Sequence, residues 1–453
     1  MEISFLGTAS CVPSVTRGVS CSALRYGGGT WLFDAGEATQ VQAQRISEVR
    51  PGKVEAIFVT HLHGDHTFGL PGILCLCGQD REKDDPPIEI FGPEGLRAYV
   101  RASLQLTQSR VAAPYVVHEL ADVPLRPPRG FRPPRPPRVP RDFGLPDAAF
   151  GETGSGTQIP RDADGGWTLA VRAAGREEPL RVRAAPMAHT VPCVGYVVTE
   201  PDRPGTLDAA AVAPIIKRNA EAFKAKGVRD PNRLYRVIKA MKADDVFTFP
   251  DGTTVKQSDV VGADKRGRCV AFCGDTADAS ALLPLLPPRG ADVVVHEATN
   301  CRVEPWDSDK SDADVERATV AHGHSTPKLA AAFATRAAAA QLVLNHFSPR
   351  YKGDASPSSL FVMSKIEEAA RAWFGPAAAD PDAVVAAWDL LTLPVHAKSV
   401  EEAAAAEADA ERRADCSAAA AAFARGEVVR KAPSGEGAPQ PRKARAVKGG
   451  AAA

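Results

Sequence analysis

The stretch His61-Leu62-His63-Gly64-Asp65-His66 decides how this chain is interpreted, because it places three imidazoles and a carboxylate within six residues. It directly follows the apolar run 56–60, which predicts a strand that ends at the cluster. Each imidazole needs a hydrogen-bond partner or a metal, and the carboxylate needs a cation. Nitrogen and oxygen ligands together suit a borderline metal such as zinc. The alternative is a polar turn with incidental histidines, but the 453 residues contain only 10 His. We therefore expect a metal site.

Three further polar residues follow apolar, strand-like runs elsewhere in the chain. They are His189, Asp275 and His346. The carboxyl ends of strands are where α/β sheets place their sites, so these residues are candidates to join the cluster. Each one alone would more often be structural. Together with the cluster, they favour a site for two metals.

The cluster resembles the His-x-His-x-Asp-His signature of the metallo-β-lactamase superfamily, and its surroundings resemble the short form of tRNase Z. The resemblance rests on 5–8 (Phe-Leu-Gly-Thr), 33–40, 91–96, 195–205, 274–276, His296-Glu-Ala-Thr, 322–326 (His-Gly-His-Ser-Thr) and 345–351. The His-Glu-Ala-Thr and His-Ser-Thr elements are the most specific of these. One motif departs from the family pattern, because Gly18 stands where Asn is usual in the loop 12–18.

The resemblance implies a four-layered αββα metallo-β-lactamase sandwich that binds two zinc ions per chain. One ion would be held by His61, His63 and His189, and the other by Asp65, His66 and His346, with Asp275 bridging both. Two metals about 3.5–4 Å apart can share a hydroxide and stabilise the attacking and leaving oxygens of a phosphodiester.

The resemblance also implies the acid–base residues. Asp65 would act as general base, His324 would protonate the leaving ribose oxygen, and Glu297 would orient His324. Glu297 could instead be an ordinary carboxylate at a strand end. Ser325 and Thr326 would help to disfavour mature tRNA that ends in CCA.

A basic segment lies within residues 206–245, which we expect to be mostly helical. Residues 215–242 contain only two acidic residues but nine basic ones: Lys217, Arg218, Lys224, Lys226, Arg229, Arg233, Arg236, Lys239 and Lys242. This imbalance favours a phosphate-binding surface over a solvated helix face, which usually mixes both signs. In the family, the equivalent stretch is an arm that clamps the tRNA elbow away from the metals. The resemblance therefore implies a homodimer in which one subunit's arm serves the other's metals.

Composition constrains the class and the compartment. The formal net charge is zero, so affinity for nucleic acid must come from local patches. Nine cysteines without a regular framework fit free thiols in a reducing compartment. No apolar run reaches the roughly 18 residues of a membrane span, and a strand is expected from residue 2. We expect a cytoplasmic protein, with the nucleus or an organelle left open.

Shifts in composition divide the chain. Residues 1–121, 167–205 and 246–397 are assigned to the catalytic sandwich, and 206–245 to the basic arm. Residues 122–166 are rich in Pro, Arg and Gly and are expected to be a disordered insertion, as is the Ala-rich and basic tail 398–453. Arginines recur at every third residue of the insertion (Arg126, Arg129, Arg132, Arg135, Arg138 and Arg141), which would align them on one face of a polyproline II helix. They would form a cationic rod for RNA, or merely a soluble linker.

The activity that the resemblance implies is a zinc-dependent endoribonuclease. It would remove 3′ trailers from precursor tRNA, leaving a 3′-hydroxyl on the tRNA and a 5′-phosphate on the trailer. Two alternatives stay open. One is a phosphodiesterase or arylsulfatase of the same fold that acts on small substrates, and the other is an RNA-binding pseudoenzyme.

Overall fold

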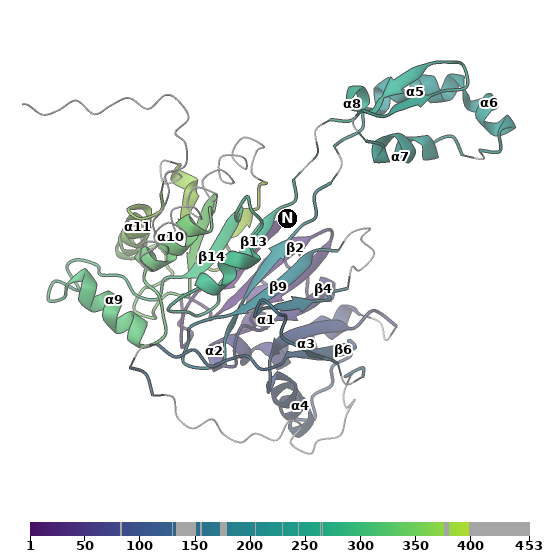
Figure 1. Ribbon diagram of the computed structural model, residues 1–453. Coiled ribbons are helices and arrows are strands. Elements are labelled where there is room, and N and C mark those ends of the chain that lie inside the picture. The colour runs from purple at the N-terminus through teal and green to yellow at the C-terminus, as the bar shows by residue number, and fades with distance from the viewer. Residues whose placement is uncertain are drawn as a thin grey trace, which may run out of the picture.

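The computed structural model describes residues 1–81, 84–128, 130–132, 151–154, 156–172, 179–203, 205–228, 230–242, 244–262, 264, 266–375 and 380–397. Two mixed sheets pack face to face, and helices cover the outer face of each (Figure 1). The predicted four-layered αββα sandwich is therefore confirmed.

The first sheet carries the amino-terminal part of the chain. Its eight strands lie in the order β17 (Thr392–Pro394), β1 (Glu2–Gly7), β2 (Cys21–Tyr26), β3 (Gly29–Phe33), β4 (Val54–Phe58), β5 (Ile88–Pro93), β6 (Tyr115–Leu120) and β7 (Gln158–Ile159). Strands β3 to β7 are parallel, so β4 delivers residues 59–66 to the same edge at which its neighbours end.

The second sheet carries the other strands of the sandwich. Its order is β16 (Val384–Ala386), β15 (Gln341–Asn345), β14 (Val293–Glu297), β13 (Cys269–Phe272), β10 (Val194–Thr199), β9 (Arg181–Pro186) and β8 (Trp167–Leu169). Strands β13 to β16 are parallel. Strand β9 runs in the same direction as β13, because β10 is antiparallel to both. Strands β9, β13, β14 and β15 therefore end at one edge.

Three apolar clusters hold the layers together. Aromatic rings fill the space between the sheets, where Phe33 stacks on Phe272 with ring centroids 3.7 Å apart and Tyr196 packs against Phe58. A second cluster lies under α1 (Thr39–Ala43), α3 (Leu70–Cys77) and α4 (Leu96–Leu106) on the first sheet. A third lies under α10 (Pro327–Arg336) and α11 (Pro357–Arg371) on the second. Burial on both faces explains why the central residues of strands β13 to β15 are apolar.

Local sequence signals set the helix boundaries. The short helix α2 (Gly64–Thr67) begins inside the histidine cluster. Helix α9 (Asp312–Ala321) begins with a capping box between Ser311 and Asp314. Helix α10 ends at Arg336, and Ala338 then adopts a left-handed φ of 47° where the chain turns back into β15.

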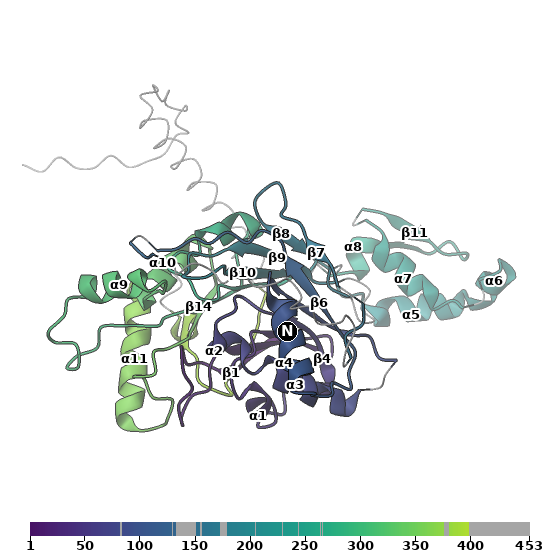
Figure 2. The same ribbon diagram turned by 90° about the horizontal axis from the view of Figure 1, so that it is seen from below.

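The basic arm protrudes from the sandwich on the side away from α9 and α11, as two views show (Figure 1, Figure 2). It contains α5 (Ala209–Arg218), α6 (Ala220–Ala225), α7 (Arg233–Ala240) and α8 (Gln257–Val260) with a hairpin of β11 (Val246–Thr248) and β12 (Thr254–Lys256). The predicted boundary at residue 245 is too early. Phe249, Val255 and Val260 pack into the same apolar cluster as the helices, and a bridge between Leu207 and Val261 closes the base of the arm.

The predicted insertion 122–166 is too long at its carboxyl end. Residues 158–159 form β7 beside β6, and the buried Glu152 receives two hydrogen bonds from the guanidinium of Arg101. Residues 151–166 thus belong to the folded body wherever the structure describes them. At the other end, Arg126 donates a hydrogen bond to the carbonyl of Pro186. Arg129, Arg135, Arg138, Arg141 and the tail 398–453 lie outside the described residues.

Within the described ranges, every helix is too short or too polar to cross a lipid bilayer. The eight cysteines in those ranges are all free thiols.

Candidate metal centre

Six segments bring histidines and carboxylates together at one edge of the sandwich. Four of these segments directly follow β4, β9, β13 and β15, one is the end of β14, and one links α9 to α10. The strand directions described above cause this convergence, because the strands that precede the cluster end at facing edges of the two sheets.

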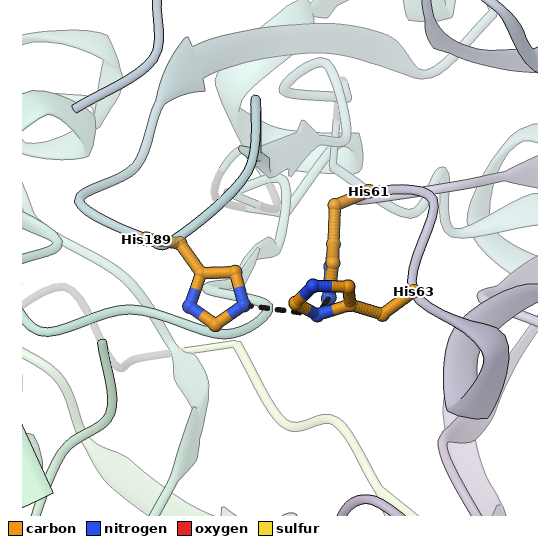
Figure 3. Close-up of side chains that lie close together, drawn as sticks. All are labelled: His61, His63 and His189. Atoms are coloured by element: carbon orange, nitrogen blue, oxygen red, sulfur yellow. Dashed lines mark hydrogen bonds between the residues drawn. The ribbon is translucent and has the colours of Figure 1, made fainter. Parts of the chain in front are cut away.

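The first group contains His61, His63 and His189 (Figure 3). The Nδ1 atom of His63 lies 3.0 Å from Nε2 of His61 and 3.2 Å from Nε2 of His189. The second ring nitrogen, Nδ1, of the buried His61 and His189 also has a hydrogen-bond partner. His189 Nδ1 donates to the carbonyl of Gly323 at 2.9 Å, and His61 Nδ1 lies 3.0 Å from the hydroxyl of Thr60. Three ring nitrogens therefore face a common point in fixed orientations.

The second group contains Asp65, His66 and His346. The Nε2 atom of His346 lies 3.3 Å from Nε2 of His66 and 3.4 Å from Oδ2 of Asp65. His66 Nδ1 lies 2.7 Å from the buried carboxylate of Asp34, and His346 Nδ1 lies 3.0 Å from the hydroxyl of Thr299. His346 also has a left-handed φ of 53°, an unusual backbone conformation that aims its ring into the cluster.

Asp275 lies between the two groups. One carboxylate oxygen is 3.2 Å from His346 Nε2 and 3.8 Å from His61 Nε2, and it is 3.9 Å from His189 Nε2. The other oxygen, Oδ1, lies 3.3 Å from His66 Nε2 but makes no hydrogen bond of acceptable geometry in the described part of the chain. A buried carboxylate oxygen without a hydrogen bond calls for another electropositive partner.

Two glycines allow the cluster to close against β3. A Cβ atom on Gly36 would lie 2.2 Å from the carbonyl oxygen of Asp65, and one on Gly69 would lie 1.9 Å from the carbonyl oxygen of Gly36. Any side chain at either position would push α2 away from the sheet. On the solvent side, the backbone N–H of Cys11 donates to Oδ2 of Asp65 at 2.6 Å and fixes that carboxylate.

The protonation equilibria follow from burial and charge. Burial lowers the pKa of His61 well below its usual value and the pKa of His189 to about 4, so both rings are neutral and able to act as ligands. Burial opposes a charge on His66 as well, but Asp275 and Asp34 outweigh it and raise the pKa of His66. In the absence of another cation, His66 therefore takes up a proton, because its ring lies between two carboxylates.

The residues present fit a pair of metal ions. Four carboxylates, those of Asp34, Asp65, Asp275 and Glu297, meet here, and none forms an ion pair with Lys or Arg among the described residues. Carboxylates gathered in an interior are strongly unfavourable unless cations compensate their charge. Imidazole and carboxylate ligands together suit divalent transition metals.

His324 and Glu297 form a pair that adjoins both ligand groups, with His324 Nδ1 3.8 Å from Oδ2 of Asp275. His324 Nδ1 lies 3.1 Å from Oε2 of the buried Glu297. Burial opposes the charge on His324, but Glu297 outweighs it and raises the pKa of His324 to about 9. The Oε1 atom of Glu297 accepts a hydrogen bond from the backbone N–H of Thr276, at 2.5 Å. The pair thus presents a protonated imidazole in a fixed orientation.

Comparisons with known proteins agree with this geometry. A sequence profile described as the metallo-beta-lactamase superfamily matches residues 15–161. The chain is 36% identical over 355 residues to mouse zinc phosphodiesterase ELAC protein 1, covering 78% of this chain and 87% of the relative. It is 35% identical over 354 residues to ribonuclease Z of Shouchella clausii, covering 78% of this chain and 88% of the relative. The chain belongs to the ribonuclease Z family.

A solved structure of this family is also similar in fold. Human tRNase Z, short form, superposes with a TM-score of 0.50 at 26% identity, covering 88% of this chain and 100% of that chain.

Several partners that hold the cluster of this ribonuclease Z family member were not singled out from the sequence. They include Asp34, Thr60 and Thr299, which orient His66, His61 and His346, and the N–H of Cys11. Asp34 and Thr299 lie inside motifs that carried the family resemblance, so a signal for them existed. Thr60 and the Cys11 amide carried no such signal.

The residues expected to contact RNA fall into two sets. In the arm, each predicted cation that the structure describes is exposed, while Arg229 lies outside the described residues. Ser325 and Thr326, in contrast, are buried, and the hydroxyl of Ser325 donates to the carbonyl of Thr276 at 2.6 Å. The structure therefore does not place these two side chains on an RNA-facing surface.

Two other histidines have structural partners. His322 follows the end of α9, where its Nδ1 lies 2.7 Å from the carbonyl oxygen of Ala318, and His118 Nδ1 lies 2.8 Å from the hydroxyl of Thr157.

Proposed function

We propose that this chain is a zinc-dependent endoribonuclease that removes 3′ trailers from precursor tRNA. Membership of the ribonuclease Z family supports it, because relatives carry the names ribonuclease Z, zinc phosphodiesterase and tRNase Z. The observation that carries the proposal is the position of Asp275, within 3.9 Å of ring nitrogens from both ligand groups.

We infer that two zinc ions bind per chain. One ion would be held by His61, His63 and His189, and the other by Asp65, His66 and His346. Asp275 would be a ligand of both ions. When bound, such a pair supplies a water of lowered pKa and stabilises charge on the oxygens of a phosphodiester.

Asp65 would accept the proton of the attacking water. The pKa of its carboxyl is lowered, because the hydrogen bond and charges of His346 and His66 outweigh the effect of burial. The backbone N–H of Cys11 keeps one oxygen in place, so the carboxylate meets the water in a fixed orientation.

His324 would donate a proton to the ribose O3′ that leaves. Its raised pKa keeps the imidazole protonated near neutral pH, and Glu297 acts as a positioning residue through the 3.1 Å contact. The products would be a tRNA with a 3′-hydroxyl and a trailer with a 5′-phosphate.

The arm would bind the body of the tRNA. Its own apolar cluster makes it a preformed unit, and its exposed cations include Lys217, Arg233 and Lys239. The arm leaves the sandwich at the ends of β10 and β13 that are remote from the cluster. This separation supports a homodimer in which the arm of one subunit serves the cluster of the other. The cytoplasmic location stays a prediction.

The proposal is tested by comparing two substrates and two proteins. The substrates are a 3′-extended precursor tRNA and bis-p-nitrophenyl phosphate, a small diester. The proteins are the full chain and a chain in which residues 208–260 are replaced by a short linker. The bridge between Leu207 and Val261 brings the cut ends together, so the sandwich should survive the excision.

We expect excision to lower kcat/KM for the precursor and to leave hydrolysis of the small diester unchanged. A full chain that hydrolyses the small diester but not the precursor would favour the small-substrate alternative. Tight precursor binding without any hydrolysis would favour the pseudoenzyme.

A further inference from the structure

A cavity of about 410 Å³ lies beside α11, outside the metal centre. Its wall includes Trp306, Arg350, Tyr351, Lys352 and Ser358. None of these residues is used in the mechanism above.

The walls continue directly from segments that form the metal centre. The loop that carries Trp306 follows β14, which ends at Glu297, and Arg350 to Lys352 follow His346 at the end of β15. Because β14 and β15 are parallel, both loops leave the sheet at the edge where the metal ligands lie. The arm lies on the opposite side of the molecule from α9 and α11 (Figure 2). The cavity therefore belongs to the catalytic edge and is remote from the arm.

The floor of the cavity is held rigidly. Arg350 donates to a carboxylate oxygen of the buried Asp307 at 2.9 Å and to the carbonyl of Cys301 at 2.6 Å, and its guanidinium lies 4.6 Å from the ring centroid of Tyr351. The hydroxyl of Tyr351 accepts a hydrogen bond from the backbone N–H of Cys301 at 2.8 Å. The two loops are thus locked together before any ligand arrives.

The rim is aromatic and cationic. Trp306 is 56% exposed, and its ring lies 6.4 Å from that of Phe361, which is 45% exposed. Lys365 Nζ lies 5.5 Å from the centroid of Phe361 and forms an ion pair with Glu368, and Lys352, which lines the cavity, is exposed. Exposed aromatic faces next to cations are the usual surface for single-stranded nucleic acid, because bases stack on the rings and phosphates meet the charges.

We propose that this cavity binds an unpaired nucleotide of the 3′ trailer. The base would stack on Trp306, while Lys352 would face its phosphate and the hydroxyl of Ser358 would lie within the pocket. The proposal rests on the proposed function, because it assigns a site to the part of the substrate that is cut off.

Size and charge favour a nucleotide over a second copy of the chain. A stable protein interface buries about 800 Å² on each partner and is depleted of charge at its centre. The cavity instead has the volume of a small-ligand site, which starts at roughly 300 Å³, and has charged side chains in its wall.

The kinetic test uses two precursors that share one tRNA body. One carries a single-nucleotide trailer and the other a trailer of about ten nucleotides, a length within the range of single-strand sites. Trp306→Ala should lower kcat/KM for the long trailer by about 5- to 100-fold, the range expected for loss of one base–aromatic stack, and leave the short one within about twofold. Trp373→Ala is the matched control, because Trp373 is 54% exposed but does not line the cavity.

Selective loss in Trp306→Ala with no loss in Trp373→Ala would support the trailer site. Equal rates for Trp306→Ala and the parent on the long trailer would overturn it, as would equal losses on both precursors. A change of oligomeric state in Trp306→Ala would also overturn it, in favour of an interface between copies.

A binding test keeps this inference separate from the proposed function. In a Trp373→Phe background, Trp306 is the remaining tryptophan with an exposed ring. A single-stranded oligoribonucleotide of the trailer sequence should quench its fluorescence saturably, and Lys352→Gln should weaken the binding. Absence of quenching would overturn the trailer site even if the precursor is cleaved. Quenching by a protein that cleaves neither precursor would support the site and contradict the proposed function.

Discussion

Asp275 is the residue on which the geometry of the cluster depends. It is 2% exposed, and its carboxylate approaches ring nitrogens of both ligand sets. A shared ligand of this kind cannot be replaced by a neighbour, because the surrounding side chains already have partners.

We predict that Asp275→Ala lowers the zinc content below the parental value of about two ions per chain and abolishes precursor cleavage. RNA binding should persist, because the arm is remote. Elemental analysis, a cleavage assay and a filter-binding assay measure the three effects. Asp278→Ala is the control, because Asp278 is exposed and its carboxylate accepts hydrogen bonds from Ser280 in its own turn. Parental cleavage by Asp275→Ala would disprove the bridging role.

His324 tests the separation of acid catalysis from metal binding. His324→Ala should keep both metals yet cleave roughly 10²–10⁴-fold more slowly, as expected for the loss of a general acid. His322→Ala is the matched control, because His322 lies two residues away and its ring bonds the carbonyl of Ala318 in α9. Loss of metal in His324→Ala would show that His324 is a ligand, which its 3.8 Å distance from Asp275 permits.

The metal ligands can be predicted from the sequence, whereas the side chains that orient them cannot, and the reason is physical. The ligands occur in short motifs at the ends of apolar runs, and that pattern is local. Supports such as Asp34 and Thr60 gain their meaning only from partners brought close by folding, and Asp34 lies 32 residues from His66. The sequence likewise did not predict that Ser325 is buried, because its hydroxyl bonds the carbonyl of Thr276, which is distant along the chain.

At the scale of elements, the error in the insertion boundary has a single cause. Composition marked residues 122–166 as unfolded because they are rich in Pro, Arg and Gly. Composition does not show that Glu152 meets Arg101 in the interior, where the two side chains are 0% and 4% exposed. The hairpin of the arm was missed for a similar reason, since its strands have only three residues each.

We predict that Glu152→Ala destabilises the protein by about 3–5 kcal/mol, because it removes the carboxylate that forms a buried ion pair with the Arg101 guanidinium. Urea denaturation of both proteins measures the difference. The double variant Arg101→Met, Glu152→Leu should be less destabilised than the single variant. An unchanged urea midpoint in Glu152→Ala would indicate that residues 151–166 are an unpacked insertion, as their composition predicts.

Some cations of the arm form ion pairs with carboxylates, and this gives a second prediction at the scale of elements. Changing Lys217, Arg233 and Lys239 to Gln should reduce the slope of log Kd against log salt by about 2 to 3. Changing Arg218 and Lys224 should reduce it less per charge, because they already pair with Asp251 and Glu221. Titrations of precursor tRNA across a salt series measure both slopes, and equal effects per charge would contradict the distinction.

At the scale of the whole molecule, the catalytic edge and the arm are two separate surfaces (Figure 1). One gathers histidines and carboxylates, and the other presents exposed cations. Such a division favours an extended substrate that spans both surfaces over a small one. The arginine stripe from Arg126 to Arg141 stays a prediction.

The most direct test of the central claim is to map the ends that the purified full chain produces from one 3′-extended precursor tRNA. The assay is run with added zinc, after removal of metal by a chelator, and after zinc is restored. We predict a single cut next to the discriminator base, with a 3′-hydroxyl on the tRNA and a 5′-phosphate on the trailer, lost on chelation and recovered with zinc. Cleavage that survives chelation, or a cut elsewhere in the RNA, would contradict the account.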